Sequence, residues 1–147
     1  MNKYEVLISS KEEKNEHIIE QFKKHNINYK VAELKAGSYG IRKNNKSVPV
    51  VIYSFSTLSF LLEKLLDHKF IEELTRLKRV KIYFLIEQKG LYENILKEQY
   101  IQRIKPLEAR GLILRVLAKF NIHLHETSRD YAASFIYAIL KTESESK

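Results

Sequence analysis

The chain has 147 residues, the size of one domain, with 44% hydrophobic and 11% aromatic residues, which is enough for a core. It has no cysteine, so disulfides, thiolate catalysis and cysteine-based zinc sites are excluded. Its 26 Lys and Arg residues outnumber 18 Asp and Glu residues, and the net charge of +8 favours an anionic partner such as nucleic acid. The same excess of charge also suits a domain that is merely kept soluble by it.

The first part of the chain predicts four strands and one helix. A helix capped by Ser10 and Glu13 is expected to end near His25. Turn residues at 36–38 and a polar hairpin tip at 44–46 separate the later strands. The strands are expected over 4–9, over 28–34, from 39 to the hairpin tip, and over 48–55.

The second part alternates helices with two further strands. Ser56 or Thr57 would cap one long helix that continues to Leu77, and Pro106 would open another. The remaining elements are strands over 81–86 and 121–125, a polar helix over 91–100, and a last helix from Thr127 or Ser128 to about Lys141. The order predicts a single α/β domain over 1–141 with one mixed sheet, followed by a polar tail, 142–147, that we expect to fray.

The last two long helices are apolar over more than one face. A helix that packs on one sheet needs a single apolar stripe, so the extra apolar surface favours a second covering surface. We expect a dimer interface, with mutual packing of the two helices within one chain as the alternative. The interface residues would be Leu112, Val116, Phe135, Ile136 and Ile139.

Several short segments follow one another in an order that resembles a known family. They are 7–12 (LISSKE), 34–39 (LKAGSY), 51–57 (VIYSFST), 67–74 (DHKFIEEL) and 84–87 (FLIE). In sequence and spacing they resemble the nuclease domain of XPF-type structure-specific endonucleases, the group that includes archaeal Hef. The resemblance implies a restriction-endonuclease-like fold, a central mixed β-sheet flanked by helices.

The resemblance also implies where the active site would lie. Ser9 and Ser38 stand where the family has Asp, and Lys11 stands for an Arg, while Glu12 is retained. Tyr53 and Phe55 replace the Glu and Lys of a Glu-Arg-Lys triplet. A hydrolytic magnesium site needs converging carboxylates and a cation at the scissile phosphate, which hydroxyls and aromatic rings do not supply. We therefore expect a degenerate nuclease with no catalytic residues, no metal and no cofactor.

The expected function is a pseudo-nuclease in DNA repair or recombination, of an archaeal-like form. It would pair with itself or with an active XPF-type nuclease and support binding of branched DNA or a repair helicase. The DNA-binding candidates are Lys11, Arg42, Lys43, Lys46 and Lys69, although each also fits an ordinary solvated face.

Three alternatives remain open. The chain could be a protein-binding adaptor with no DNA contact. It could also be an active nuclease whose ligands come from Glu12, Glu72, Glu73 and Glu87. His123 and His125 alternate on a strand and could share an ion, but an edge-strand pair without metal is the commoner arrangement. The absence of a signal peptide and of a long apolar run predicts a cytoplasmic protein without a membrane span.

Overall fold

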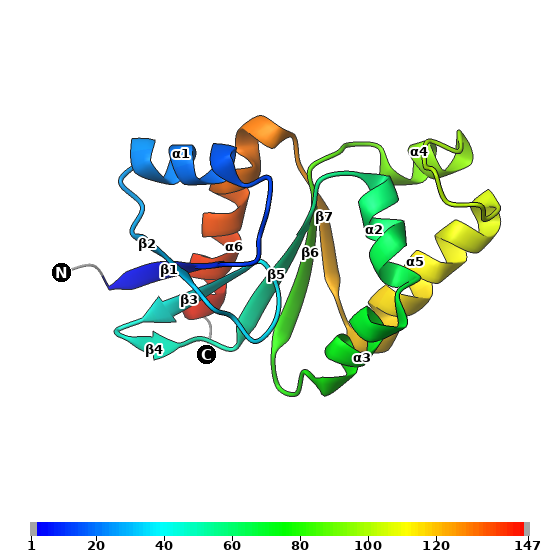
Figure 1. The fold of residues 1–147 in the computed structure, drawn as a ribbon. Helices are drawn as coiled ribbons and strands as arrows, with labels where there is room; N and C mark the ends of the chain where they lie inside the picture. Colours follow the sequence, from blue (N-terminus) through cyan, green and yellow to red (C-terminus); the bar gives the residue numbers. More distant parts are fainter. Residues whose placement is uncertain (1–2, 146–147) are drawn as a thin grey trace.

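The computed structural model describes residues 3–145, which form a mixed seven-stranded sheet between two layers of helices (Figure 1). The strand order is β2-β1-β3-β5-β6-β7, and β4 extends β3 as a short hairpin. β1 and β5 lie antiparallel to β3, whereas β2, β6 and β7 join by parallel pairing. The strands are β1 (Tyr4–Ser9), β2 (Tyr29–Ala32), β3 (Tyr39–Lys43), β4 (Lys46–Ser47), β5 (Val50–Phe55), β6 (Lys81–Ile86) and β7 (His123–Glu126). This confirms the predicted central mixed sheet.

The helices divide between the two faces of the sheet (Figure 1). One face is covered by α1 (Glu16–Lys24) and α6 (Ala132–Glu145), which follows a short 3-10 turn, η1 (Arg129–Tyr131). The other is covered by α2 (Leu58–Leu65), α3 (His68–Arg76), α4 (Leu91–Leu96) and α5 (Pro106–Phe120). Alternate side chains of β5 therefore enter different cores: Ile52 packs with α1 and α6, and Tyr53 packs with α2 and α3. Every residue of β5 is buried, as expected for a central strand.

Three predicted boundaries were wrong. The long helix after Thr57 is two helices, because Asp67 interrupts it and its Oδ1 accepts a hydrogen bond from the Lys69 amide at 3.0 Å. The first helix begins after Asn15, so Ser10 and Glu13 do not cap it. The segment 142–145, expected to fray, continues α6, and Lys43 Nζ donates to the Ser144 carbonyl oxygen at 3.0 Å. Residues 146 and 147 of the predicted tail lie outside the described residues.

The predicted dimer surface needs correction. α5 and α6 lie on opposite faces of the sheet, so they form neither one shared surface nor a mutually packed pair. Val116, Ile136 and Ile139 are buried within the chain's own cores, and Leu112 is half-buried against α2 and its neighbours. Of the five residues, Phe135 is the most accessible. The broad apolar surface of each helix is explained by contacts with its own face of the sheet.

No helix within residues 3–145 has the length and apolar character to cross a bilayer.

Candidate functional site

A cleft of about 670 Å³ opens where several strands end. β1, β5 and β6 all run in the same direction, so their carboxyl ends meet at one edge of the sheet. The loop between β2 and β3 brings residues 34–38 to the same place. The structure thus gathers all six positions singled out from the sequence: Ser9, Lys11, Glu12, Ser38, Tyr53 and Phe55 line this cleft.

Ser9 and Ser38 lie side by side, since the Ser9 amide donates to the Ser38 carbonyl oxygen at 2.9 Å. Both residues are buried. Their hydroxyls are engaged with nearby backbone: Ser9 Oγ accepts from the Lys11 amide at 3.3 Å, and Ser38 Oγ accepts from the Ser54 amide at 3.1 Å. Neutral hydroxyls that already accept backbone hydrogen bonds are weak ligands for Mg²⁺, which prefers carboxylate oxygens.

Gly37 is what lets the loop reach the sheet. Its φ of +79° is left-handed, and a Cβ at this position would lie 2.0 Å from Val51 Cγ2. Only glycine fits there, and the tight turn delivers Ser38 to β5, where its amide donates to the Ile52 carbonyl oxygen at 2.7 Å.

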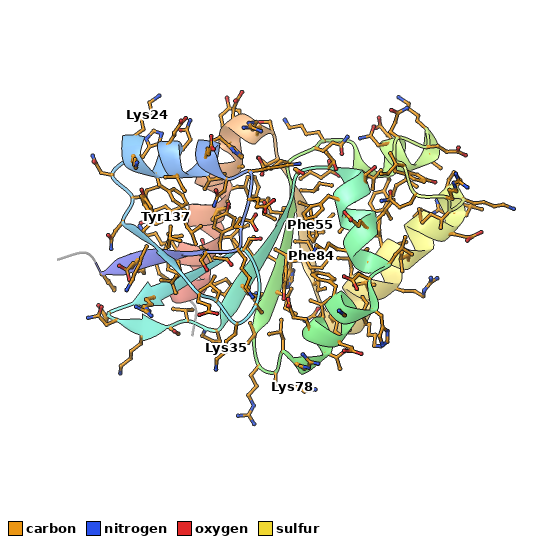
Figure 2. The ribbon with its side chains drawn as sticks, viewed as in Figure 1. Lys24, Lys35, Phe55, Lys78, Phe84 and Tyr137 are labelled. Atoms are coloured by element: carbon orange, nitrogen blue, oxygen red, sulfur yellow. The ribbon has the colours of Figure 1, made fainter. Side chains whose placement is uncertain are left out.

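Tyr53 and Phe55 fill the floor of the cleft with aromatic rings. Both pack edge-on against Phe84, with ring centroids 5.8 and 5.0 Å away. Figure 2 labels Phe55 and Phe84 of this group. The Tyr53 hydroxyl donates to Glu73 Oε2 on α3 at 2.5 Å. Burial, and next the bond to Glu73, raise the pKa of Tyr53 far above its usual range, so this phenol stays a neutral donor. The hydrogen bond therefore fixes the carboxylate of Glu73, on α3, against the ring of Tyr53.

Two further carboxylates, Glu12 and Glu87, face the same space. Burial raises the pKa of Glu12, a hydrogen bond from Ser38 opposes this, and the charge of Glu87 adds to the rise. Glu87 is fixed by His17: its Oε1 lies 2.5 Å from His17 Nε2, and its Oε2 lies 3.5 Å from Ser54 Oγ. The His17 side chain is only 14% exposed.

The charges around the cleft do not favour a phosphate. Four lysines, Lys11, Lys14, Lys35 and Lys64, face five glutamates, Glu12, Glu13, Glu63, Glu73 and Glu87. Within residues 3–145 no three His, Asp or Glu side chains are grouped so that they could hold a metal ion. The residues present therefore do not fit the magnesium ion that an XPF-type site would need. Glu72, one of the four acids considered for a relocated site, instead pairs with His68 and Arg76 on α3.

The predicted DNA-binding residues do not share one surface. Lys11 lines the cleft, whereas Lys69 is exposed near the start of α3 and is not among the residues that line the cleft. Arg42 lies 3.8 Å from a carboxylate oxygen of Glu5. Lys43 and Lys46 lie at the opposite end of the sheet. His123 and His125 stack on Tyr83, with ring centroids 5.2 and 5.9 Å away, which is an edge-strand aromatic cluster.

The comparisons with known proteins agree with this fold. The family model described as the ERCC4 domain matches residues 8–139, so the chain belongs to the ERCC4 domain family. No curated protein matches the sequence. Among solved structures, the chain is similar to XPF from Aeropyrum pernix, with a TM-score of 0.71 at 13% identity. It is similar as well to XPF from Aeropyrum pernix in complex with DNA, with a TM-score of 0.68 at 15% identity. Each match covers 96% of this chain and 65% of the other, and such low identities establish the fold alone.

Proposed function

We propose that this chain is a non-catalytic ERCC4-domain protein that acts in DNA repair or recombination by binding rather than cutting. The observation that carries the proposal is the composition of the cleft. Two serine hydroxyls and two aromatic rings occupy the positions where an XPF-type nuclease has acids and a lysine. Three of the five glutamates of the cleft are engaged: Glu73 by Tyr53, Glu87 by His17, and Glu12 by Ser38.

A hydrolytic mechanism needs a cation to stabilise charge on the transferring phosphate. In this cleft the four lysines are offset by five glutamates, so the transition state would gain little electrostatic stabilisation. The membership of the family, the similarity to a structure solved with DNA and the net charge of +8 support DNA as the partner.

The test is a cleavage assay with the full chain on flap, fork and Holliday-junction DNA in Mg²⁺ or Mn²⁺. The expected result is intact DNA at enzyme-to-DNA ratios where an active XPF-type nuclease cleaves completely. Cleavage that disappears in the Glu12→Gln and Glu87→Gln variants would show that the site is active and would overturn the proposal. Cleavage that persists in both variants and co-purifies with the chain through a second purification step would overturn it as well.

A protein-binding adaptor is the second candidate, and one surface favours it. Ile101, on the segment that joins α4 to α5, is 85% exposed, and Leu107, in the first turn of α5, is 66% exposed. Exposed apolar side chains at neighbouring positions favour a protein partner, which would be a second copy, an active XPF-type nuclease or a repair helicase. Sedimentation of the Ile101→Ser/Leu107→Ser variant tests the second copy. An unchanged dimer or an unchanged monomer would both exclude this surface from self-association.

A further inference from the structure

A second depression, of about 830 Å³, lies at the amino ends of β5 and β6, at the far end of the sheet from the cleft. The hairpin of β3 and β4, the turn before β6 and the last turn of α6 surround it (Figure 1). We call it the basic groove and define it by Lys43, Lys46, Arg79, Lys81 and Glu143. Figure 2 places Lys78, another cation, at the same end of the molecule.

The charges of the basic groove differ from those of the cleft. Four cations, Lys43, Lys46, Arg79 and Lys81, face one carboxylate, Glu143. Glu143 is already neutralised by Lys81, with Nζ 3.1 Å from Oε2. Lys46 and Arg79 are exposed and make no ion pair with any residue in the described part of the chain. Of these two hollows, the basic groove therefore has an excess of positive charge and the cleft does not.

The backbone places like charges against one another. Lys43 and Lys46 are direct cross-strand partners in the β3–β4 hairpin. Like charges in this position destabilise a hairpin unless something neutralises them. Lys43 is partly satisfied by the Ser144 carbonyl oxygen, whereas Lys46 has no such acceptor among residues 3–145. An anion that both side chains reach would stabilise the arrangement.

Arg79 lies in a turn whose backbone conformation is unfavourable for a residue with a side chain. Its φ of +58° is left-handed, a conformation that long side chains rarely adopt and that glycine would adopt freely. A glycine here would relax the turn and remove the charge. Strained positions of this kind concentrate at sites of function, where the side chain rather than the backbone is needed.

We infer that the basic groove binds the phosphate backbone of duplex DNA, with Lys46 and Arg79 as the principal contacts. The inference rests on the proposed DNA-binding function and gives it a location. The six residues of β5 separate the groove from the cleft, which corresponds to roughly 20 Å at the rise of an extended strand. Duplex held in the groove therefore has its phosphates far from Ser9 and Ser38. An open, shallow depression lined by separated cations suits a backbone with repeated phosphates better than one small anion.

The experiment compares two double charge reversals with the same change in net charge. Lys46→Glu/Arg79→Glu alters the basic groove, and Lys11→Glu/Lys35→Glu alters the cleft at two exposed lysines. Binding of the full chain to a fluorescein-labelled 20-base-pair duplex is measured by anisotropy over a range of salt concentrations. All four substituted residues of the two variants are exposed, and thermal unfolding of each variant confirms that it is folded.

The expected result is a loss of at least tenfold in affinity for the groove variant and less than threefold for the cleft variant. The slope of log K against log salt should decrease by about two for the groove variant, because two phosphate contacts are lost. Equal losses in both variants, a larger loss in the cleft variant, or no binding by the unmodified chain would each overturn the inference. The cleavage assay on the same samples reports on the absence of catalysis, so the two proposals fail separately.

Discussion

The hydroxyl of Tyr53 on β5 donates a hydrogen bond of 2.5 Å to Glu73 Oε2 on α3. This hydrogen bond joins the floor of the cleft to α3, the helix at its border. The resemblance to XPF-type nucleases places Tyr53 where they have a glutamate, and in the proposed non-catalytic site a donor that binds another carboxylate takes the place of a metal ligand. The ring of Tyr53 also packs edge-on against Phe70, with 5.2 Å between the ring centroids. Tyr53 is therefore part of a larger aromatic core.

We expect Tyr53→Phe to lower the free energy of unfolding by about 1–2 kcal/mol, because Glu73 loses a hydrogen bond while the ring is kept. Urea denaturation at pH 7 measures the change. Tyr131→Phe is the matched control, since Tyr131 is 67% exposed, and it should stay within about 0.5 kcal/mol of the unmodified chain. Equal stability of all three proteins would mean that the Tyr53–Glu73 bond contributes nothing.

The strands could be predicted because their signals are local. The runs at 4–9 and 81–86 became β1 and β6 with unchanged bounds. The residues that would meet in the cleft could also be predicted, because the order of the short segments indicated the family. The pairing of His17 with Glu87 was not predictable, because 70 residues separate them and only the packing of α1 against the sheet joins them.

Two of the errors in the helices have different physical causes. The leucine spacing continues across Asp67, and that periodicity hid the break, although Asp67 ahead of Lys69 and Phe70 is itself a capping signal. For α5 and α6, apolar residues on more than one face suggested an external surface. A helix buried on its own side of a sheet that has helices on both faces shows the same pattern, and only the fold tells the two apart.

The break at Asp67 gives a second prediction. Asp67→Ala should lower the free energy of unfolding by about 1 kcal/mol, because the Lys69 amide at the start of α3 loses its acceptor. Asp67→Asn keeps an acceptor at the same place and should be nearly neutral. Chemical denaturation of both variants measures the difference. An Asp67→Ala protein as stable as Asp67→Asn would show that α3 needs no cap.

The turn at Gly37, which places Ser38 beside β5, gives a third prediction. Gly37→Ala combines a left-handed backbone with a Cβ that would lie 2.0 Å from Val51 Cγ2, and we expect a loss of about 2–5 kcal/mol. Gly90→Ala is the control: its φ of +78° is similar, but the nearest atom, Asn94 Nδ2, is 3.8 Å away. It should lose only about 1–2 kcal/mol from the backbone term. Thermal and urea unfolding compare the two. Equal losses would show that the contact with Val51 relaxes freely.

The last prediction concerns the pH dependence that Glu12 confers. Burial raises the pKa of its carboxyl above the ordinary value of 4.5, so the folded state favours the protonated form more than the unfolded state does. The stabilisation from this proton is fully present below pH 4.5 and is lost as pH rises through the raised pKa. Glu12→Gln, which mimics the protonated form, should therefore become more stable relative to the unmodified chain as pH rises from 4 to 7.

Urea midpoints at pH 4, 5, 6 and 7 for the unmodified chain, Glu12→Gln and Glu13→Gln measure this effect. Glu13 lies in the same turn but is exposed, so its substitution should give a difference that changes little with pH. If the Glu12→Gln difference is flat across the same range, or falls as pH rises, burial does not govern this carboxylate. A rise confined to Glu12→Gln would show that the cleft opposes the accumulation of negative charge.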